Sequence, residues 1–166
     1  MGAAGEQAVA ATLDGLPVVW SALHSIPLGD PDSPTSDLDH LVIGPGGVYV
    51  INAKHHPRQA ILVKGDIVLV ARRSQPYTAA ARRDATRRDA TSVTVRLSAA
   101  VGTPVAVIPV IVFVGADEVV IKFPPRDTVL TTRGQMLDAP TRRRASLDAP
   151  TVTTIVDIAR QPSAWR

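Results

Sequence analysis

The chain has 166 residues, of which 45% are hydrophobic, and this predicts a single domain over residues 1–166 with a core of about 5–160. It has no cysteine, which excludes disulfide frameworks and thiolate metal sites and agrees with a reducing, cytoplasmic location. The start lacks a signal-type segment, and the longest apolar run, 105–114, is about half the length that spans a bilayer. We therefore expect no membrane association.

The net charge of +3 hides an asymmetry between two parts of the chain. Residues 1–57 carry six acids and one base, whereas residues 58–166 carry nine acids and seventeen bases. Fifteen of the eighteen basic residues are arginine, whose planar guanidinium suits phosphate better than the ammonium of lysine does. An anionic partner would therefore approach the second part, although abundant arginine beside alanine and valine is also typical of a GC-rich genome.

The first part of the chain predicts one short helix followed by strands. Helix-forming residues before Gly15 predict a helix over 5–13, and a valine-rich segment with Trp20 predicts a strand over 16–23. Prolines, aspartates and serines over 27–36 predict a turn-rich loop. The elements that follow are two apolar strands joined by Gly44-Pro45-Gly46-Gly47, and a hairpin over 60–63 and 67–70 that turns at Lys64-Gly65-Asp66.

The second part predicts a long helix that leads into a buried strand. A helix over 77–100 has an inward stripe at Ala79, Thr86, Ala90, Val93 and Leu97. The β-branched run 105–114 is typical of a strand buried on both faces, and the helical crossover before it favours parallel pairing. The remaining predictions are strands over 119–123 and 128–131, a loop over 139–150, and a helix over 151–160 capped by Thr151 or Thr153. This order predicts an α/β fold with a mixed central sheet flanked by helices.

The polar residues that indicate chemistry lie between 36 and 56, on the two strands of the glycine-rich turn. Asp39 is on the first strand, and Asn52 and Lys54 are on the second. Side chains alternate between the faces of a strand, so Asn52 and Lys54 emerge together while Ala53 points the other way. The sequence thus predicts a carboxylate, an amide and a lysine at one edge of the sheet.

Three segments carry a resemblance to a known family: GEQ at 5–7, DLDHLVIGPGGVYVINAKHH at 37–56, and QPY at 75–77, which a basic helix follows. In their order and spacing they resemble the nuclease-related domain (NERD) family, a branch of the PD-(D/E)xK nuclease superfamily. The resemblance implies a restriction-endonuclease-like fold and a nuclease that uses Mg²⁺ or Mn²⁺ to hydrolyse nucleic acid, with DNA favoured over RNA.

The resemblance also implies roles for individual residues. Asp39 matches the metal-binding aspartate, Lys54 the lysine that orients or activates the attacking water, and Glu6 a more distant ligand. Gln75, in the QPY segment, is expected to support the site from outside. Asn52 falls where the family has its second metal-binding carboxylate. Its amide oxygen can bind a metal but brings no charge, so we expect weak metal binding and slow or absent hydrolysis.

Other polar residues near the motif have two readings. His40 is expected to be a core residue or a donor that supports the site, and His55 and His56 to be exposed or to face phosphate beside Lys54. Successive strand residues diverge, so one zinc ion cannot easily collect these histidines. The long helix presents Arg82, Arg83, Arg87 and Arg88, which form either a nucleic-acid track or a solvated face braced by Asp84 and Asp89.

Three functions remain open from the sequence. The first is a nuclease with impaired catalysis, and the second is a non-catalytic module that binds nucleic acid. The third is a structural or protein-interaction domain in which Lys54 pairs with Asp39 as a structural salt bridge. The sequence also leaves homo-oligomerisation open.

Overall fold

The computed structural model describes residues 3–30, 33–71, 73–74 and 76–166, with side chains in all of these except 30, 33–35, 73–74 and 76–84. Its elements, in chain order, are α1 (Ala3–Leu13), β1 (Ser21–Asp30), β2 (Ser33–Gly44), β3 (Gly47–His55), β4 (Ala60–Lys64), β5 (Ile67–Val70), β6 (Arg73–Ser74), α2 (Pro76–Val101), β7 (Val107–Val114), β8 (Glu118–Phe123), β9 (Val129–Thr132), α3 (Asp138–Thr141), α4 (Ala149–Ala159) and the 3₁₀ turn η1 (Pro162–Trp165).

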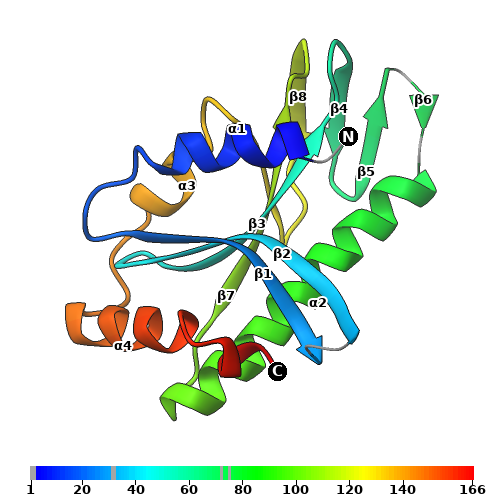
Figure 1. Cartoon of the computed structure of the whole chain (residues 1–166). Helices are drawn as coiled ribbons and strands as arrows, with labels where there is room; N and C mark the ends of the chain where they lie inside the picture. The colour runs from blue at the N-terminus through cyan, green and yellow to red at the C-terminus, as the bar shows by residue number, and fades with distance from the viewer. Residues whose placement is uncertain (1–2, 31–32, 72, 75) are drawn as a thin grey trace.

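The main sheet has five strands in the order β1-β2-β3-β7-β9. β1, β2 and β3 pair antiparallel, whereas β7 runs parallel to both β3 and β9. The connection from β3 to β7 includes α2, in agreement with the helical crossover that the sequence predicts (Figure 1). The sheet is therefore mixed and flanked by helices, as predicted.

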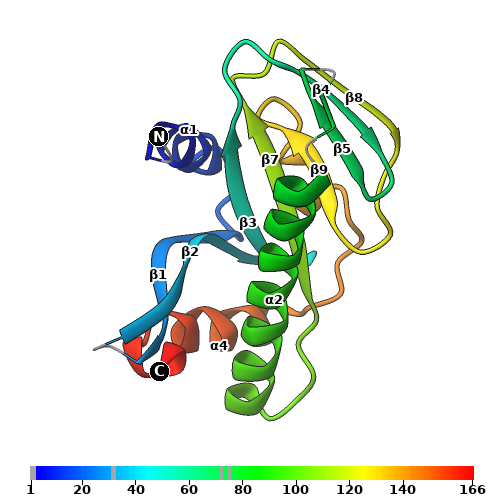
Figure 2. The same cartoon turned by 90° about the vertical axis from the view of Figure 1, so that its right-hand side faces the viewer.

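Helices cover both faces of this sheet (Figure 2). On one face, α2 and α4 pack against β2 and β3 through Leu41, Val50, Val93, Leu97 and Ile155. On the other face, α1 packs against Val42, Ile51 and Val112 through Val9 and Leu13. Alternate residues of β2 and β3 thus belong to different cores, so a polar residue in this region has a defined helix facing it.

A second, four-stranded sheet has the order β6-β5-β4-β8. The predicted hairpin forms its β4–β5 pair, and Gly65 adopts the positive φ that the turn requires, +57°. β8 pairs parallel to β4, and Ile61 and Val63 pack against Ile111 and Phe113 of the main sheet. The sequence predicted β4, β5 and β8, but neither β6 nor the separation of these strands into a sheet of their own.

Two predictions for the first part were wrong. Residues 16–20 form turns, and the strand begins only at Ser21, because Trp20 packs over the glycine turn instead of extending β1. A Cβ added to Gly44 would lie 2.3 Å from Trp20, so this position needs glycine. The predicted loop over 27–36 is mostly strand: β1 continues to Asp30, and Pro27 pairs with Asp37. Proline is tolerated there because β1 is an edge strand, whose outer N–H groups need no partner.

The C-terminal predictions need smaller corrections. A short helix, α3, interrupts the predicted loop over 139–150. The final helix begins at Ala149, and its cap is Asp148, whose carboxylate accepts the N–H of Thr151 at 2.8 Å. Neither predicted threonine is the cap, since an aspartate followed by proline at the helix start already supplies it. None of the described helices is long and apolar enough to cross a membrane.

Candidate active site

The candidate site lies where β2 and β3 separate. Their backbone pairing ends with His40 opposite Ile51. At the residue before His40, the side chain of Asp39 takes the place of a backbone acceptor: its Oδ2 accepts the N–H of Ala53 at 2.9 Å. This bond holds the carboxylate at the rim of the sheet, next to the strand positions that carry Asn52 and Lys54. The sequence predicted this juxtaposition from strand alternation.

Asn52 points toward α2. Its side chain is buried, with 7% of its surface exposed, and its Nδ2 donates a hydrogen bond to Oγ1 of Thr86 at 2.9 Å. Lys54 is two residues further along β3 and so projects on the same face. α2 therefore forms one wall of the site.

A second aspartate of the site, Asp89, comes from α2. It is half-buried, and Ser36 of β2 donates a hydrogen bond to its Oδ1 at 3.4 Å. The sequence interpretation missed this role and treated Asp89 as a brace for neighbouring arginines. A signal was present, because Thr86 interrupts the apolar inward stripe of the helix, and a residue three positions later lies on the same side.

Burial and neighbouring charges set the electrostatics of the two aspartates. Burial is the main cause that raises the pKa of Asp39, with smaller contributions from Glu6 and Asp89, while the Ala53 N–H and Lys54 lower it. Burial also raises the pKa of Asp89, against hydrogen bonds from Ser36 and Asn52 and the charges of Arg88 and Lys54. The site thus holds like charges near one another in a partly dehydrated place, and the charge of Lys54 acts on both aspartates.

Glu6 approaches the site from the opposite face of the sheet. α1 passes close to β3 at Gly5, where an added Cβ would lie 3.3 Å from the Cβ of His55. This close contact brings Glu6 near enough to influence the pKa of Asp39. The helix therefore contributes a third carboxylate to the electrostatics of the site, while the role of Glu6 as a distant metal ligand stays a prediction.

The histidines do not gather around Asp39. His40 is buried on the α1 side of β2, and its Nδ1 lies 2.8 Å from Nδ1 of His24 on β1. His55 is exposed on that side, opposite to Lys54. His56 is half-buried, with its ring 6.1 Å from that of Phe113. Of the two roles predicted for His40, the structure thus favours a core residue.

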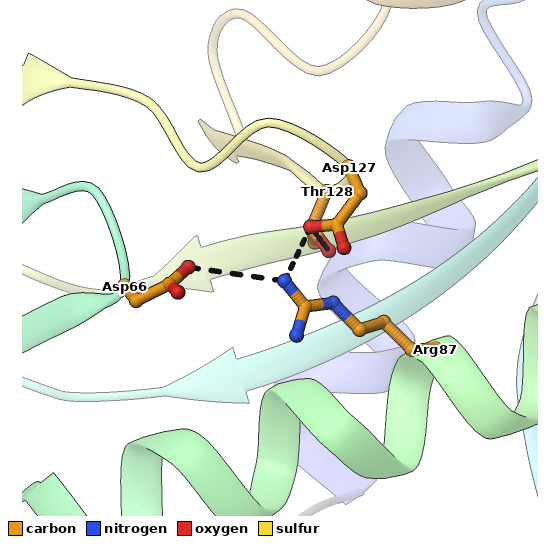
Figure 3. A network of polar contacts seen from close by, with 4 residues as sticks. All are labelled: Asp66, Arg87, Asp127 and Thr128. Atoms are coloured by element: carbon orange, nitrogen blue, oxygen red, sulfur yellow. Dashed lines mark hydrogen bonds and ion pairs between the residues drawn. The ribbon is translucent and has the colours of Figure 1, made fainter.

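Arg87 ties α2 to two loops (Figure 3). Its guanidinium donates a hydrogen bond to Asp127, before β9, and lies 3.8 Å from Asp66 in the β4–β5 turn. Binding of a phosphate by Arg87 would therefore compete with these two carboxylates. Of the other arginines predicted for this track, Arg88 is exposed, whereas Arg82 and Arg83 have side chains outside the described part of the chain. Gln75 lies outside the described residues altogether.

The donor set at the rim suits a hydrated magnesium ion better than a closed metal cage. Across residues with described side chains, no three histidine, aspartate or glutamate side chains converge closely enough to enclose an ion. Mg²⁺ is commonly held by only one or two carboxylates, with water and substrate phosphate completing the octahedron. Asp39 and Asp89 are two half-buried carboxylates: the charge of Asp89 raises the pKa of Asp39, and the charge of Lys54 lowers the pKa of both. A divalent cation fits such a place.

The mixed sheet with flanking helices, and a rim with an aspartate on one strand and a lysine on the next, agree with a nuclease fold of the PD-(D/E)xK class. The model of the family described as nuclease-related domain, NERD, matches residues 1–114, which include every strand and helix that builds the rim. The chain therefore belongs to the NERD family, and its function is nuclease-related. No curated protein and no solved structure matches it.

Proposed function

We propose that the chain is a metal-dependent nuclease domain that hydrolyses phosphodiester bonds of nucleic acid, with DNA favoured over RNA. The single observation that carries the proposal is the Asp39 carboxylate held on the Ala53 N–H at the strand rim, where the charge of Lys54 reaches it. Membership of the NERD family supplies the reaction class.

Each residue of the rim has a proposed role. Asp39 is the carboxylate that binds Mg²⁺ or Mn²⁺, and the cation, when bound, stabilises the charge that develops on the phosphate. The Lys54 ammonium orients the attacking water and stabilises the same charge through a fixed N–H donor. Glu6, on α1, adds negative potential that favours a cation at Asp39.

Asn52 makes catalysis slow in this proposal. A carboxylate there would add charge for the metal, whereas the amide donates to Thr86 and leaves a neutral oxygen. Because Mg²⁺ prefers anionic oxygen ligands, its occupancy falls at a given concentration. Mn²⁺, which binds nitrogen and oxygen sites more tightly, is expected to support more activity than Mg²⁺.

The nucleic acid would lie over the Lys54 side of the rim. Lys54 lies at this place near the end of β3, His56 follows the strand directly, and the predicted basic face of α2 begins with Arg82 and Arg83. His55 projects from the opposite face of β3, so it would contact only nucleic acid that passes around the end of the strand. Phosphate contacts of this kind position the strand without reading its sequence. Arg87 joins this surface if substrate displaces Asp66 or Asp127 from its guanidinium.

The test is cleavage of plasmid DNA, single-stranded DNA and RNA with Mg²⁺ or Mn²⁺. We compare the wild type with Asp39→Asn, which removes one charge but keeps an acceptor for the Ala53 N–H. The matched control is Asp37→Asn, an exposed position two residues away on the same strand. We expect metal-dependent cutting that falls at least about a hundredfold in Asp39→Asn and is unchanged in Asp37→Asn.

Two results would decide for the other functions. Binding of nucleic acid with a steep dependence on salt, without cleavage by any variant, would establish a non-catalytic module, because phosphate neutralisation releases counterions. Neither binding nor cleavage would leave a structural or protein-interaction domain.

A further inference from the structure

The environment of Asn52 and Asp89 links strand β3 to helix α2 by polar contacts. Thr86 and Asp89 are three residues apart and so lie on one side of the helix. Thr86 accepts the hydrogen bond of the Asn52 amide at 2.9 Å, and Asp89 accepts that of Ser36 on β2 at 3.4 Å. Asp89 is thereby placed against the two strands that carry Asp39 and Asn52.

The charge at this place explains why an amide suits position 52. A carboxylate there would set a further negative charge against Asp89 and could not donate a hydrogen bond to Thr86 Oγ1. An amide has two N–H donors and no charge, so it can face both Thr86 and the carboxylate of Asp89 without repulsion. The amide on the strand and the carboxylate on the helix are therefore a compatible pair.

The pair also preserves the number of carboxylates at the rim. Position 52 has lost the acid of the family pattern, whereas α2 brings one acid, Asp89, to the same face of the sheet. Asp89 acts on Asp39 electrostatically, and both interact with the charge of Lys54. The site therefore has two half-buried acids near Lys54, the same number that it would have with an acid at position 52 of β3 and none at position 89.

We infer that Asp89 supplies from α2 the second carboxylate for a divalent cation at the Asp39 rim, and that Asn52 is the neutral partner that permits it. The inference rests on the proposed function and deepens it, because it assigns the missing charge to a residue of another element. It also changes the expectation for an added strand acid: Asn52→Asp alone should conflict with Asp89.

The test is an exchange of the two side chains in the full chain. The variants are Asp89→Asn, Asn52→Asp and the double variant, with Asp157→Asn on the exposed side of α4 as the matched control. Asp89→Ser removes the charge with a smaller side chain, in case Asp89→Asn folds poorly. Two measurements are made without nucleic acid: Mn²⁺ binding by titration calorimetry, and thermal unfolding in EDTA.

We expect Asp89→Asn and Asp89→Ser to weaken Mn²⁺ binding at least about tenfold, because affinity follows the number of charged ligands. The double variant should recover to within about threefold of the wild type, and Asp157→Asn should bind normally. In EDTA, Asn52→Asp should unfold at a lower temperature than the wild type, because the new carboxylate at position 52 is repelled by that of Asp89. The double variant should regain the loss, since it has an amide at position 89.

Unchanged Mn²⁺ binding in both Asp89 variants would overturn the inference, as would a double variant that binds no better than Asp89→Asn, or a wild type that binds no Mn²⁺. The proposed function fails separately. If Mn²⁺ binding follows the exchange but no nucleic acid is cut, the inference stands and the nuclease activity does not.

Discussion

Two places on α2, two residues apart, use charge in different ways. At Asp89 the helix faces the main sheet, where half-buried aspartates share the charge of Lys54. At Arg87 it faces the small sheet, where the guanidinium meets two carboxylates that are 56% and 67% exposed (Figure 3). The first place keeps like charges together at a cost in stability, which is typical of functional sites. The second balances opposite charges near water and is typical of a structural contact.

The largest expected difference between the two places is in activity. Lys54→Met should lower nucleic acid cleavage at least about a hundredfold, because it removes a fixed positive group beside the reacting phosphate. Arg87→Met should change the cleavage rate by less than about threefold, since its guanidinium is engaged by Asp66 and Asp127. Initial rates at saturating Mn²⁺ would measure both effects. A loss as large in Arg87→Met would assign Arg87 to the active surface instead.

A second expected difference is in pH dependence, which should arise from the buried strands. Burial and the nearby His24 lower the pKa of His40 from 6.5 to about 4. Between pH 6.5 and about pH 4, His40 binds a proton in the unfolded chain but not in the folded chain. The free energy of unfolding therefore falls as the pH falls. The loss should reach about 3 kcal/mol near pH 4, and it should be absent above about pH 7.

Urea unfolding of wild type, His40→Asn and His55→Asn at several pH values would measure this loss. His40→Asn should show a flatter dependence between pH 6.5 and 4, because its side chain does not titrate. His55 is exposed on the same face of the main sheet as His40, so His55→Asn should behave as the wild type does. Parallel curves for all three proteins would show that His40 is not the cause.

The smallest expected effect is the contribution of Arg87 to stability. Its ion pairs lie near the surface, so Asp127→Asn should lower the free energy of unfolding by about 1 kcal/mol or less. The loss should shrink further in 1 M salt, where charges are screened within about 3 Å. Asp117→Asn, an exposed residue before β8, serves as the control. A loss that salt does not change would mean that packing, and not charge, makes the contact important.

Local patterns predicted most of the elements. Helix-forming residues predicted α1, helical spacing predicted α2, β-branched residues predicted β7, and the Lys64-Gly65-Asp66 turn predicted the β4–β5 hairpin. The failures occurred where long-range pairing overcame local preference: the proline-rich residues 27–36 form strand because β2 offers them a partner. Asp148 as the cap of α4 was also missed, although it is the more usual residue at that position.

The sequence by itself determined that Asp39, Asn52 and Lys54 share one edge, because alternation along a strand and a short turn leave little choice. Only the tertiary structure decided which helix faces that edge. The packing of α2 on β3 brings Thr86 to Asn52 and Asp89 toward Asp39, across more than thirty residues of chain. Helical periodicity marks which side of α2 turns inward, but the strand positions it meets depend on how two cores pack together.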